Sequence, residues 1–186
     1  MAEMNWLSRR LIDLRTESRA RRVLARLGSH LELSTTAQVL ELGSGGGGLL
    51  ALLHDRFHPA RLVGTDYDVA QVDAARKLLT ARWGEIPRSV ELEPADALSL
   101  PFPDRSFDDV FAMMMLHHVE ERPTEYVRRP QALQEIRRVL KPGGLLVYSE
   151  IFRRKEIRET LRSLGFAEAF LRPGWRSDLG VFRSPS

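Results

Sequence analysis

The chain has 186 residues, a formal net charge of +3 and no cysteine. This length corresponds to one domain, whose core can bury roughly 70% of the surface that the unfolded chain exposes. The lack of cysteine excludes disulfides, thiolate metal sites and a cysteine nucleophile, and the small charge excess, spread along the chain, disfavours a nucleic-acid partner.

Residues 1–35 are predicted to form an N-terminal helical segment, followed by a main domain over residues 36–186. Apolar residues recur there at helical spacing, and seven arginines stand against three acids between Met1 and His30. We expect this segment to form a lid. Its arginines either face solvent or contact an acidic membrane or an anionic substrate. No apolar run approaches the roughly 18 residues of a membrane span and no secretory signal is recognisable, which predicts a cytoplasmic protein.

From residue 37 onward, short apolar segments alternate with segments of helical period. This alternation is typical of βαβ units and a mostly parallel sheet. The expected fold class is α/β, a three-layer doubly wound (Rossmann-like) sandwich whose ligand lies beyond the carboxyl ends of the first strands. In chain order, we expect strands over 37–42, 60–66, 89–94, 107–114, 144–151, 166–172 and 179–183, and helices over 47–57, 69–83, 130–140 and 154–164.

The segment that follows the first strand is the strongest local sign of a nucleotide. Five of the six residues from 43 to 48 are glycine, which permits a tight turn and lets a ligand lie against the backbone at a helix N-terminus. Gly43, Gly45 and Gly48 satisfy the dinucleotide fingerprint, while a second pattern, which begins at Glu41, fits adenosylmethionine. The loop alone does not decide between them. Its candidate cofactor-binding residues are Glu41, Gly43, Ser44, Gly45 and Gly47.

The next two strands end in acidic residues. Asp66 stands about 20 residues after the glycine loop and can accept both ribose hydroxyls of an adenosine, whereas Asp68 is better placed as a helix cap. Tyr67 packs on the adenine or faces the core. Asp96 can accept from the adenine amino group, and the N–H of Ala97 can address a ring nitrogen. A dinucleotide enzyme has less need of that acid, and no tyrosine has a lysine four residues later, so hydride transfer is disfavoured.

Four segments occur in a fixed order: ELGSGGGG, VGTDYD, ADALSLPFPDRSFDDVFAMMMLHHVEE and EIRRVLKPGGLLVYSE. Together they resemble the class I S-adenosylmethionine-dependent methyltransferases, in particular the ubiquinone/menaquinone-biosynthesis methyltransferase branch. The resemblance covers roughly residues 37 to 184. It implies a seven-stranded, mostly parallel sheet with the last strand antiparallel, and S-adenosyl-L-methionine as cofactor.

The same resemblance distributes the cofactor over the site. It implies that Glu41 and the glycine loop surround the methionine moiety, that Asp66 holds the ribose, and that Asp96 holds the adenine. The backbone at Met113 and Met114 is implied to lie near the methionine and the methyl group. The segment 141–144 is expected to be a tight turn that leads into the fifth strand.

Methyl transfer from a sulfonium is an in-line displacement, so the protein chiefly has to align the reacting atoms. His117 and His118, just past the fourth strand, are the candidate catalytic bases for a phenol, enol or amine acceptor. We favour His117 because it follows the strand end more closely; in the alternative, one histidine caps a turn and the other packs. No metal is expected, because His54 and His58 lack an apparent third ligand.

The sequence predicts the acceptor only by class. The lack of cysteine excludes methylation of cytosine carbon through a thiolate adduct, and residues 113–118 lack the Asn/Asp-Pro-Pro-aromatic signature of many enzymes that methylate nucleic-acid amino groups. Both absences favour a small-molecule or lipid-like acceptor, with Trp6, Leu7, Leu11 and Trp175 as candidate pocket walls. The alternatives are a non-catalytic S-adenosylmethionine-binding protein and, with less support, an NAD(P)-dependent oxidoreductase.

Overall fold

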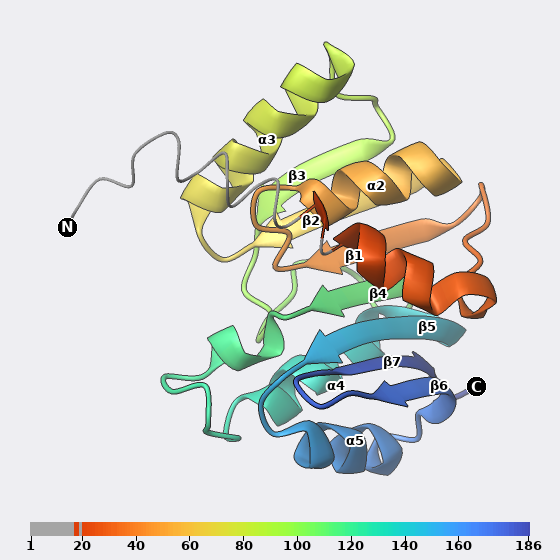
Figure 1. The fold of residues 1–186 in the computed structure, drawn as a ribbon, viewed down its shortest axis with the longest axis vertical. Coiled ribbons are helices and arrows are strands. Elements are labelled where there is room, and N and C mark those ends of the chain that lie inside the picture. The colour runs from red at the N-terminus through yellow and green to blue at the C-terminus, as the bar shows by residue number, and fades with distance from the viewer. Residues whose placement is uncertain (1–16, 19) are drawn as a thin grey trace.

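The computed structural model describes residues 17, 18 and 20–186. A seven-stranded sheet in the order β3-β2-β1-β4-β5-β7-β6 forms its centre (Figure 1). The first six strands run in the same direction and β7 runs antiparallel to both of its neighbours, as predicted. The strands are β1 (Gln38–Leu42), β2 (Arg61–Asp66), β3 (Val90–Pro94), β4 (Phe107–Met113), β5 (Leu140–Glu150), β6 (Ala167–Pro173) and β7 (Asp178–Arg183).

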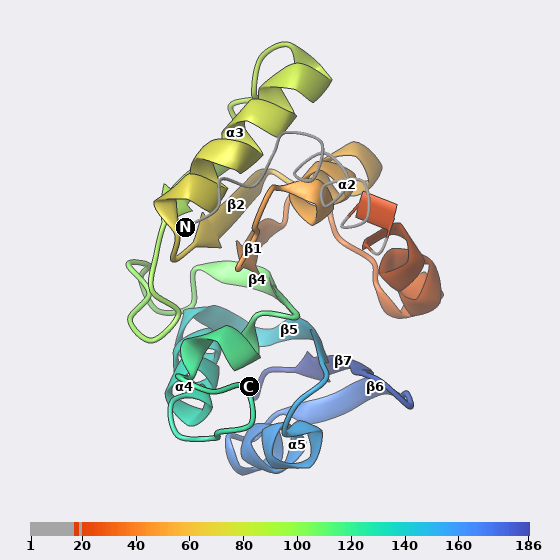
Figure 2. The same cartoon turned by 60° about the vertical axis from the view of Figure 1, so that its left-hand side comes forward.

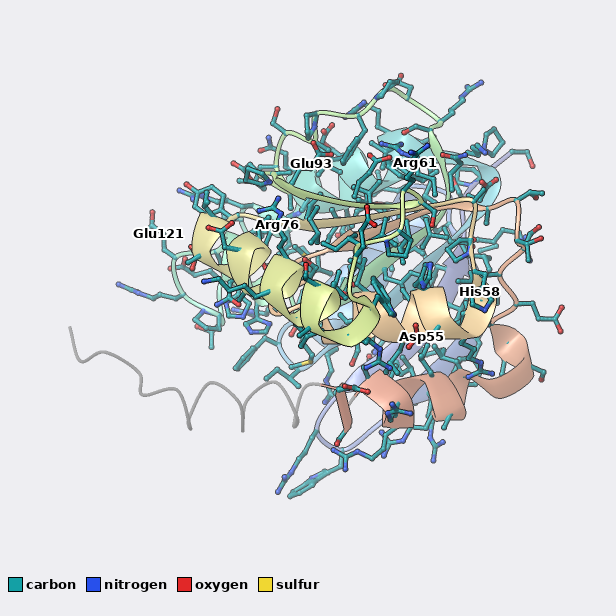
Figure 3. The ribbon with its side chains drawn as sticks, turned by 90° about the horizontal axis from the view of Figure 1, so that it is seen from above. Asp55, His58, Arg61, Arg76, Glu93 and Glu121 are labelled. Atoms are coloured by element: carbon teal, nitrogen blue, oxygen red, sulfur yellow. The ribbon has the colours of Figure 1, made fainter. Side chains whose placement is uncertain are left out.

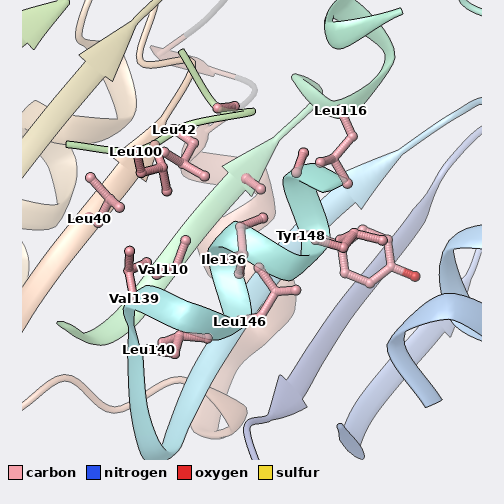
Figure 4. Packing of buried hydrophobic residues seen from close by; sticks show 14 of the residues in the cluster. Leu40, Leu42, Leu100, Val110, Leu116, Ile136, Val139, Leu140, Leu146 and Tyr148 are labelled. Atoms are coloured by element: carbon pink, nitrogen blue, oxygen red, sulfur yellow. The ribbon is translucent and has the colours of Figure 1, made fainter. Parts of the chain in front are cut away.

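Helices cover both faces of the sheet, which confirms the predicted three-layer architecture (Figure 2). Two buried apolar clusters occupy the two helix–sheet interfaces. Figure 4 shows Leu40 and Val110 of the sheet beside Ile136 of the helix that covers them. One face carries α2 (Gly48–Phe57) and α3 (Val69–Trp83), the other carries α4 (Arg129–Val139) and α5 (Arg154–Ser163), and η1 (Gly28–His30) and η2 (Leu116–Val119) are short 3-10 turns.

One predicted boundary is wrong. The strand β5 begins at Leu140, which pairs with Phe107, and not at residue 144. The register then moves directly to Leu145 opposite Asp109, so residues 141–144 form an irregular excursion inside the strand. The expected turn over 141–144 is therefore part of β5. All other predicted boundaries lie within one residue of the observed ones.

The described part of the N-terminal segment packs on the core. Residues 20–27 are helical, and Leu24 and Leu27 are buried in the same cluster as α2. Arg22 and Arg26 are exposed. Trp6, Leu7 and Leu11 lie outside the described residues, so the lid and membrane roles of 1–35 stay predictions. In the part of the chain that the structure describes, no helix is long and apolar enough to cross a membrane.

A carboxyl group, that of Asp109, is buried near the start of β4 with 6% of the residue exposed. Burial raises the pKa of Asp109 from 3.8 to about 7, and the neighbouring Asp108 adds to the effect. Because the folded-state pKa exceeds the unfolded-state value, the unfolded state binds fewer protons between these values, and stability falls as pH rises through this window.

We therefore expect Asp109→Asn to raise the free energy of unfolding at pH 8 by roughly 2–4 kcal/mol. At pH 4 the same substitution has little effect, because the carboxyl is already protonated in the folded state. Urea denaturation at both values checks this. An effect of equal size at pH 4 and pH 8 contradicts the assignment to ionisation of Asp109.

Candidate active site

A cavity of about 580 Å³ opens at the carboxyl ends of the strands, where β1 lies between β2 and β4. Its volume is in the range of small-molecule and cofactor sites, and it lies where the strand order reverses. Of the predicted site residues, the lining includes Gly43, Gly45, Asp66, Tyr67, Asp96, Ala97, Met114 and His118, and it does not include Glu41, Ser44, Gly47, Met113 or His117.

Positive φ angles at alternate glycines turn the chain from β1 into α2. Gly43, Gly45 and Gly47 have φ values of 66°, 50° and 81°. A Cβ atom on Gly43 would lie 2.6 Å from the Cβ of Met115, which is backbone-proximal and unable to move away. Glycine is therefore required at this position for both conformation and space. The loop therefore borders the cavity with the backbone of Gly43 and Gly45.

Asp66 ties this loop to the end of β2. Its Oδ2 accepts from the N–H of Gly45 at 2.9 Å, and its Oδ1 accepts from the N–H of Asp68 at 3.0 Å. The N–H of Ser44 donates to the carbonyl oxygen of Thr65 at 2.8 Å. Two N–H groups of the glycine loop, those of Ser44 and Gly45, are thus used within the protein. Asp66 lines the cavity, and each of its oxygens keeps a further lone pair for a hydroxyl donor.

Two buried polar atoms near the glycine loop have no partner within the described chain: Oε2 of Glu41 and Oγ of Ser44. Burial raises the pKa of Glu41 well above its usual range, and repulsion from Asp66 contributes. Buried polar atoms are normally hydrogen-bonded, so their presence here fits a site that takes up a polar ligand.

Asp96, the second predicted acidic residue of the site, lies in the cavity wall just after the end of β3. The exposed side chain of Asp96 lines the cavity, and its Oδ1 accepts from the N–H of Leu98 at 2.9 Å. Ala97 lies between them with its side chain buried. Tyr67 is 80% exposed at the cavity, so the interpretation that placed it in the core is wrong. Its ring is available to a planar ligand group.

The chain after β4 forms the opposite wall. Met114 adopts a left-handed conformation with φ of 59°, fixed by a hydrogen bond from its N–H to the carbonyl oxygen of Ser149 at 2.8 Å. Such strain is characteristic of functional sites. Val119, Glu120 and Arg128 also line the cavity, although the sequence predicted the N-terminal helices as the principal lid. Their contribution has no local sequence signal, because it arises from the path of the loop between η2 and α4.

The two adjacent histidines have different environments. Nδ1 of His117 lies 2.9 and 3.0 Å from the two carboxylate oxygens of Glu150, whose side chain is fully buried. The backbone N–H of His117 donates to the same carboxylate. The ring of His118 lies 4.1 Å from that of His117, centroid to centroid, and lines the cavity. Burial lowers the pKa of His118, and the neighbouring His117 adds to this effect. His118 is therefore neutral at pH 7 and able to accept a proton.

The charges of the cavity suit a cationic cofactor. Its described lining presents the carboxylates of Asp66, Asp68 and Asp96, and Arg128 is the sole arginine or lysine among the described lining residues. Glu120 also lines the cavity, but its carboxylate is buried against Arg129. A dinucleotide brings two phosphate groups that need free N–H donors or cations. S-adenosylmethionine instead carries a sulfonium and an ammonium group. The residues present fit S-adenosylmethionine and do not fit a pyrophosphate.

A family model described as a methyltransferase domain matches residues 40–148, more than half of the chain. The chain belongs to this methyltransferase family. S-adenosylmethionine is the cofactor of the family, as the sequence predicted, and it supplies the methyl group when bound.

Two relatives place the methyltransferase domain more narrowly. It is 33% identical over 151 residues to a fatty-acid O-methyltransferase of Mycolicibacterium smegmatis. This match covers 77% of this chain and 50% of the relative. It is 34% identical over 149 residues to a demethylmenaquinone methyltransferase of Thermus thermophilus. That match covers 80% of this chain and 55% of the relative. The predicted resemblance to the quinone-biosynthesis branch is confirmed. The chain spans about half the length of these relatives.

Among solved structures, the [4+2]-cyclase SpnF matches the methyltransferase domain with a TM-score of 0.74 and 20% identity, over 91% of this chain and 81% of that chain. At this identity the likeness shows the fold alone. Because one fold carries different chemistry, activity has to be argued from the residues of the site.

Proposed function

We propose that this protein transfers a methyl group from S-adenosylmethionine to a small-molecule or lipid-like acceptor. The cavity carries the proposal, because it joins an acidic wall suited to a cationic cofactor with a neutral histidine. The relatives, named for a fatty acid and for demethylmenaquinone, support this acceptor class. A cytoplasmic location and membrane contact through the N-terminal arginines belong to the same proposal, and fractionation of cells that express the full chain tests both.

The residues divide the work of holding the cofactor. Asp66 offers two carboxylate oxygens to the ribose hydroxyls, and Asp96 with the N–H of Ala97 addresses the adenine edge. Glu41, Ser44, Gly47 and the loop glycines shape the methionine end, together with the backbone of Met113 and Met114. Holding the methyl group in line with a bound acceptor supplies most of the several kcal/mol by which the protein lowers the activation barrier.

His118 is the base in this proposal, and His117 with Glu150 positions it. Although the sequence favoured His117, only His118 lines the cavity, while His117 is engaged by a buried carboxylate. A base is needed only when the acceptor carries a proton, as a phenol, enol or amine does. A fatty-acid carboxylate is already ionised and needs none.

We expect His118→Ala to lower kcat by about 100-fold with a phenolic or enolic acceptor and to leave the Kd for S-adenosylmethionine within about twofold. Since burial lowers the pKa of His118, kcat/KM of the unmodified protein rises with pH through a midpoint below 6.5 and is level above it. Steady-state kinetics of both forms measure this. A larger loss in His117→Ala would return the role of base to His117.

The proposal is tested by incubation of the full chain with S-adenosylmethionine and a panel of fatty acids, phenols, quinols and amines. Mass spectrometry of each acceptor should show one added methyl group and an equal amount of S-adenosylhomocysteine. Cofactor binding without turnover on any member of the panel would favour the non-catalytic alternative.

A further inference from the structure

The exposed hydrophobic side chains are concentrated at one end of the molecule. In the described part of the chain, four large hydrophobic side chains are exposed: Tyr67, Val69, Val127 and Trp175. The first two follow β2, Val127 precedes α4, and Trp175 lies in the turn between β6 and β7. These segments are all at the carboxyl edge of the sheet, which also holds the cavity (Figure 1). Figure 3 shows Glu121 at this edge and His58 at the opposite one.

Trp175 is the most exposed of the four, at 89%. It was a candidate pocket wall, and this prediction is wrong, because Trp175 is not among the residues that line the cavity. The turn that carries it is anchored: the N–H of Gly174 donates to the carbonyl oxygen of Ser177 at 3.0 Å, and Arg154 donates to the carbonyl oxygen of Gly174 at 2.6 Å. An exposed indole on a fixed turn is available to an external partner.

The tip of this hairpin is cationic. Arg172 and Arg176 are exposed, neither forms an ion pair with a described residue, and the Arg176 guanidinium lies 5.4 Å from the Trp175 ring centre. Asp178 is buried and paired with Arg154 and with Arg158. The acidic wall of the cavity is on the side of β2 and β3, at the other end of the strand order. Positive charge and an aromatic tip thus coincide beside β5.

We propose that this carboxyl edge docks on an anionic lipid surface through the β6–β7 hairpin, defined here as residues 172–178. Tryptophan favours membrane–water interfaces, and arginine beside it binds acidic headgroups. A fluid interface accepts separate apolar side chains such as Val127 and Trp175 independently, whereas a protein partner would need a complementary pocket for each. Docking in this orientation turns the mouth of the cavity toward the membrane, where a lipid-like acceptor of the proposed reaction would enter.

Sedimentation of the full chain with vesicles tests the proposal without any need for activity. The protein should sediment with vesicles of phosphatidylcholine mixed with phosphatidylglycerol, and much less with phosphatidylcholine alone. Each arginine at an anionic surface contributes about a fivefold factor to partitioning, so Arg172→Glu with Arg176→Glu should lower the partition coefficient at least about 25-fold. Trp175→Ala should lower it about tenfold, through lost apolar burial.

The matched control is Arg56→Glu with Arg88→Glu, which makes the same charge change at two exposed arginines near the starts of β2 and β3, at the opposite edge of the sheet. This variant should bind the mixed vesicles within about twofold of the unmodified chain. Circular dichroism and cofactor affinity should be unchanged in every variant. The proposal is overturned if the unmodified chain does not bind mixed vesicles, if the control loses as much binding as the hairpin variant, or if Trp175→Ala binds like the unmodified chain.

Discussion

Substitution of Asp66 by alanine is expected to raise the Kd for S-adenosylmethionine at least about 100-fold. The change removes the acceptors for two hydroxyl groups, each charge-assisted hydrogen bond being worth about 1.5–3 kcal/mol. It also frees the N–H of Gly45, which Asp66 binds at 2.9 Å, so the glycine loop loses its link to β2. Calorimetric titration with S-adenosylmethionine measures the effect.

The matched control for this substitution is Asp73→Ala, which removes the same charge from an exposed position on α3 where Asp73 pairs with Arg76. It should leave the Kd within about twofold, since exposed ion pairs contribute little. Asp66→Asn keeps one acceptor oxygen, so its Kd for S-adenosylmethionine should lie between those of the other two variants. A Kd for Asp66→Ala within threefold of the unmodified value, with the fold intact by circular dichroism, would remove Asp66 from the binding site.

Glu120→Ala is expected to lower the free energy of unfolding by about 3–5 kcal/mol, because it leaves a buried charge without its partner. The Glu120 and Arg129 side chains are 1% and 0% exposed and lie 3.7 Å apart, Oε1 to Nε. The Glu120 carboxylate also accepts from the N–H groups of Val127, Arg128 and Arg129 at the start of α4. Its removal therefore releases a helix N-terminus as well as the arginine.

Urea denaturation of Glu120→Ala beside Glu121→Ala measures this difference. The neighbouring Glu121 is exposed and pairs with Arg128 at 3.4 Å, so its substitution should change stability by no more than about 0.5 kcal/mol. Equal destabilisation by both substitutions would show that the buried pair makes no special contribution.

Most of the fold could be predicted because its signals are local. Apolar strands such as 39–42 and helical periods such as 69–83 show their type within a few residues, and parallel strands then bring Asp66 and Asp96 to the same edge of the sheet. The start of β5 could not be predicted, because it depends on a pairing of Leu140 with Phe107 across an irregular excursion.

The features that the sequence did not reveal depend on distant partners. Arg129 precedes the helix expected over 130–140 and carries no local sign of burial, yet it is buried, where it donates to the carbonyl oxygen of Phe152 and faces Glu120. The link from Glu150 to His117 spans 33 residues, and it separates the roles of two histidines that are adjacent in the sequence. Trp175 was assigned to the pocket from its residue type, but the direction of the hairpin exposes it.

Calorimetric titration of the full chain with S-adenosylmethionine, S-adenosylhomocysteine and NADH tests the central claim most directly. The acidic cavity wall and the internally bonded glycine loop predict one-to-one binding of the first two ligands and none of the dinucleotide. Binding of NADH without binding of S-adenosylmethionine would contradict the assignment of this cavity to a methyl donor.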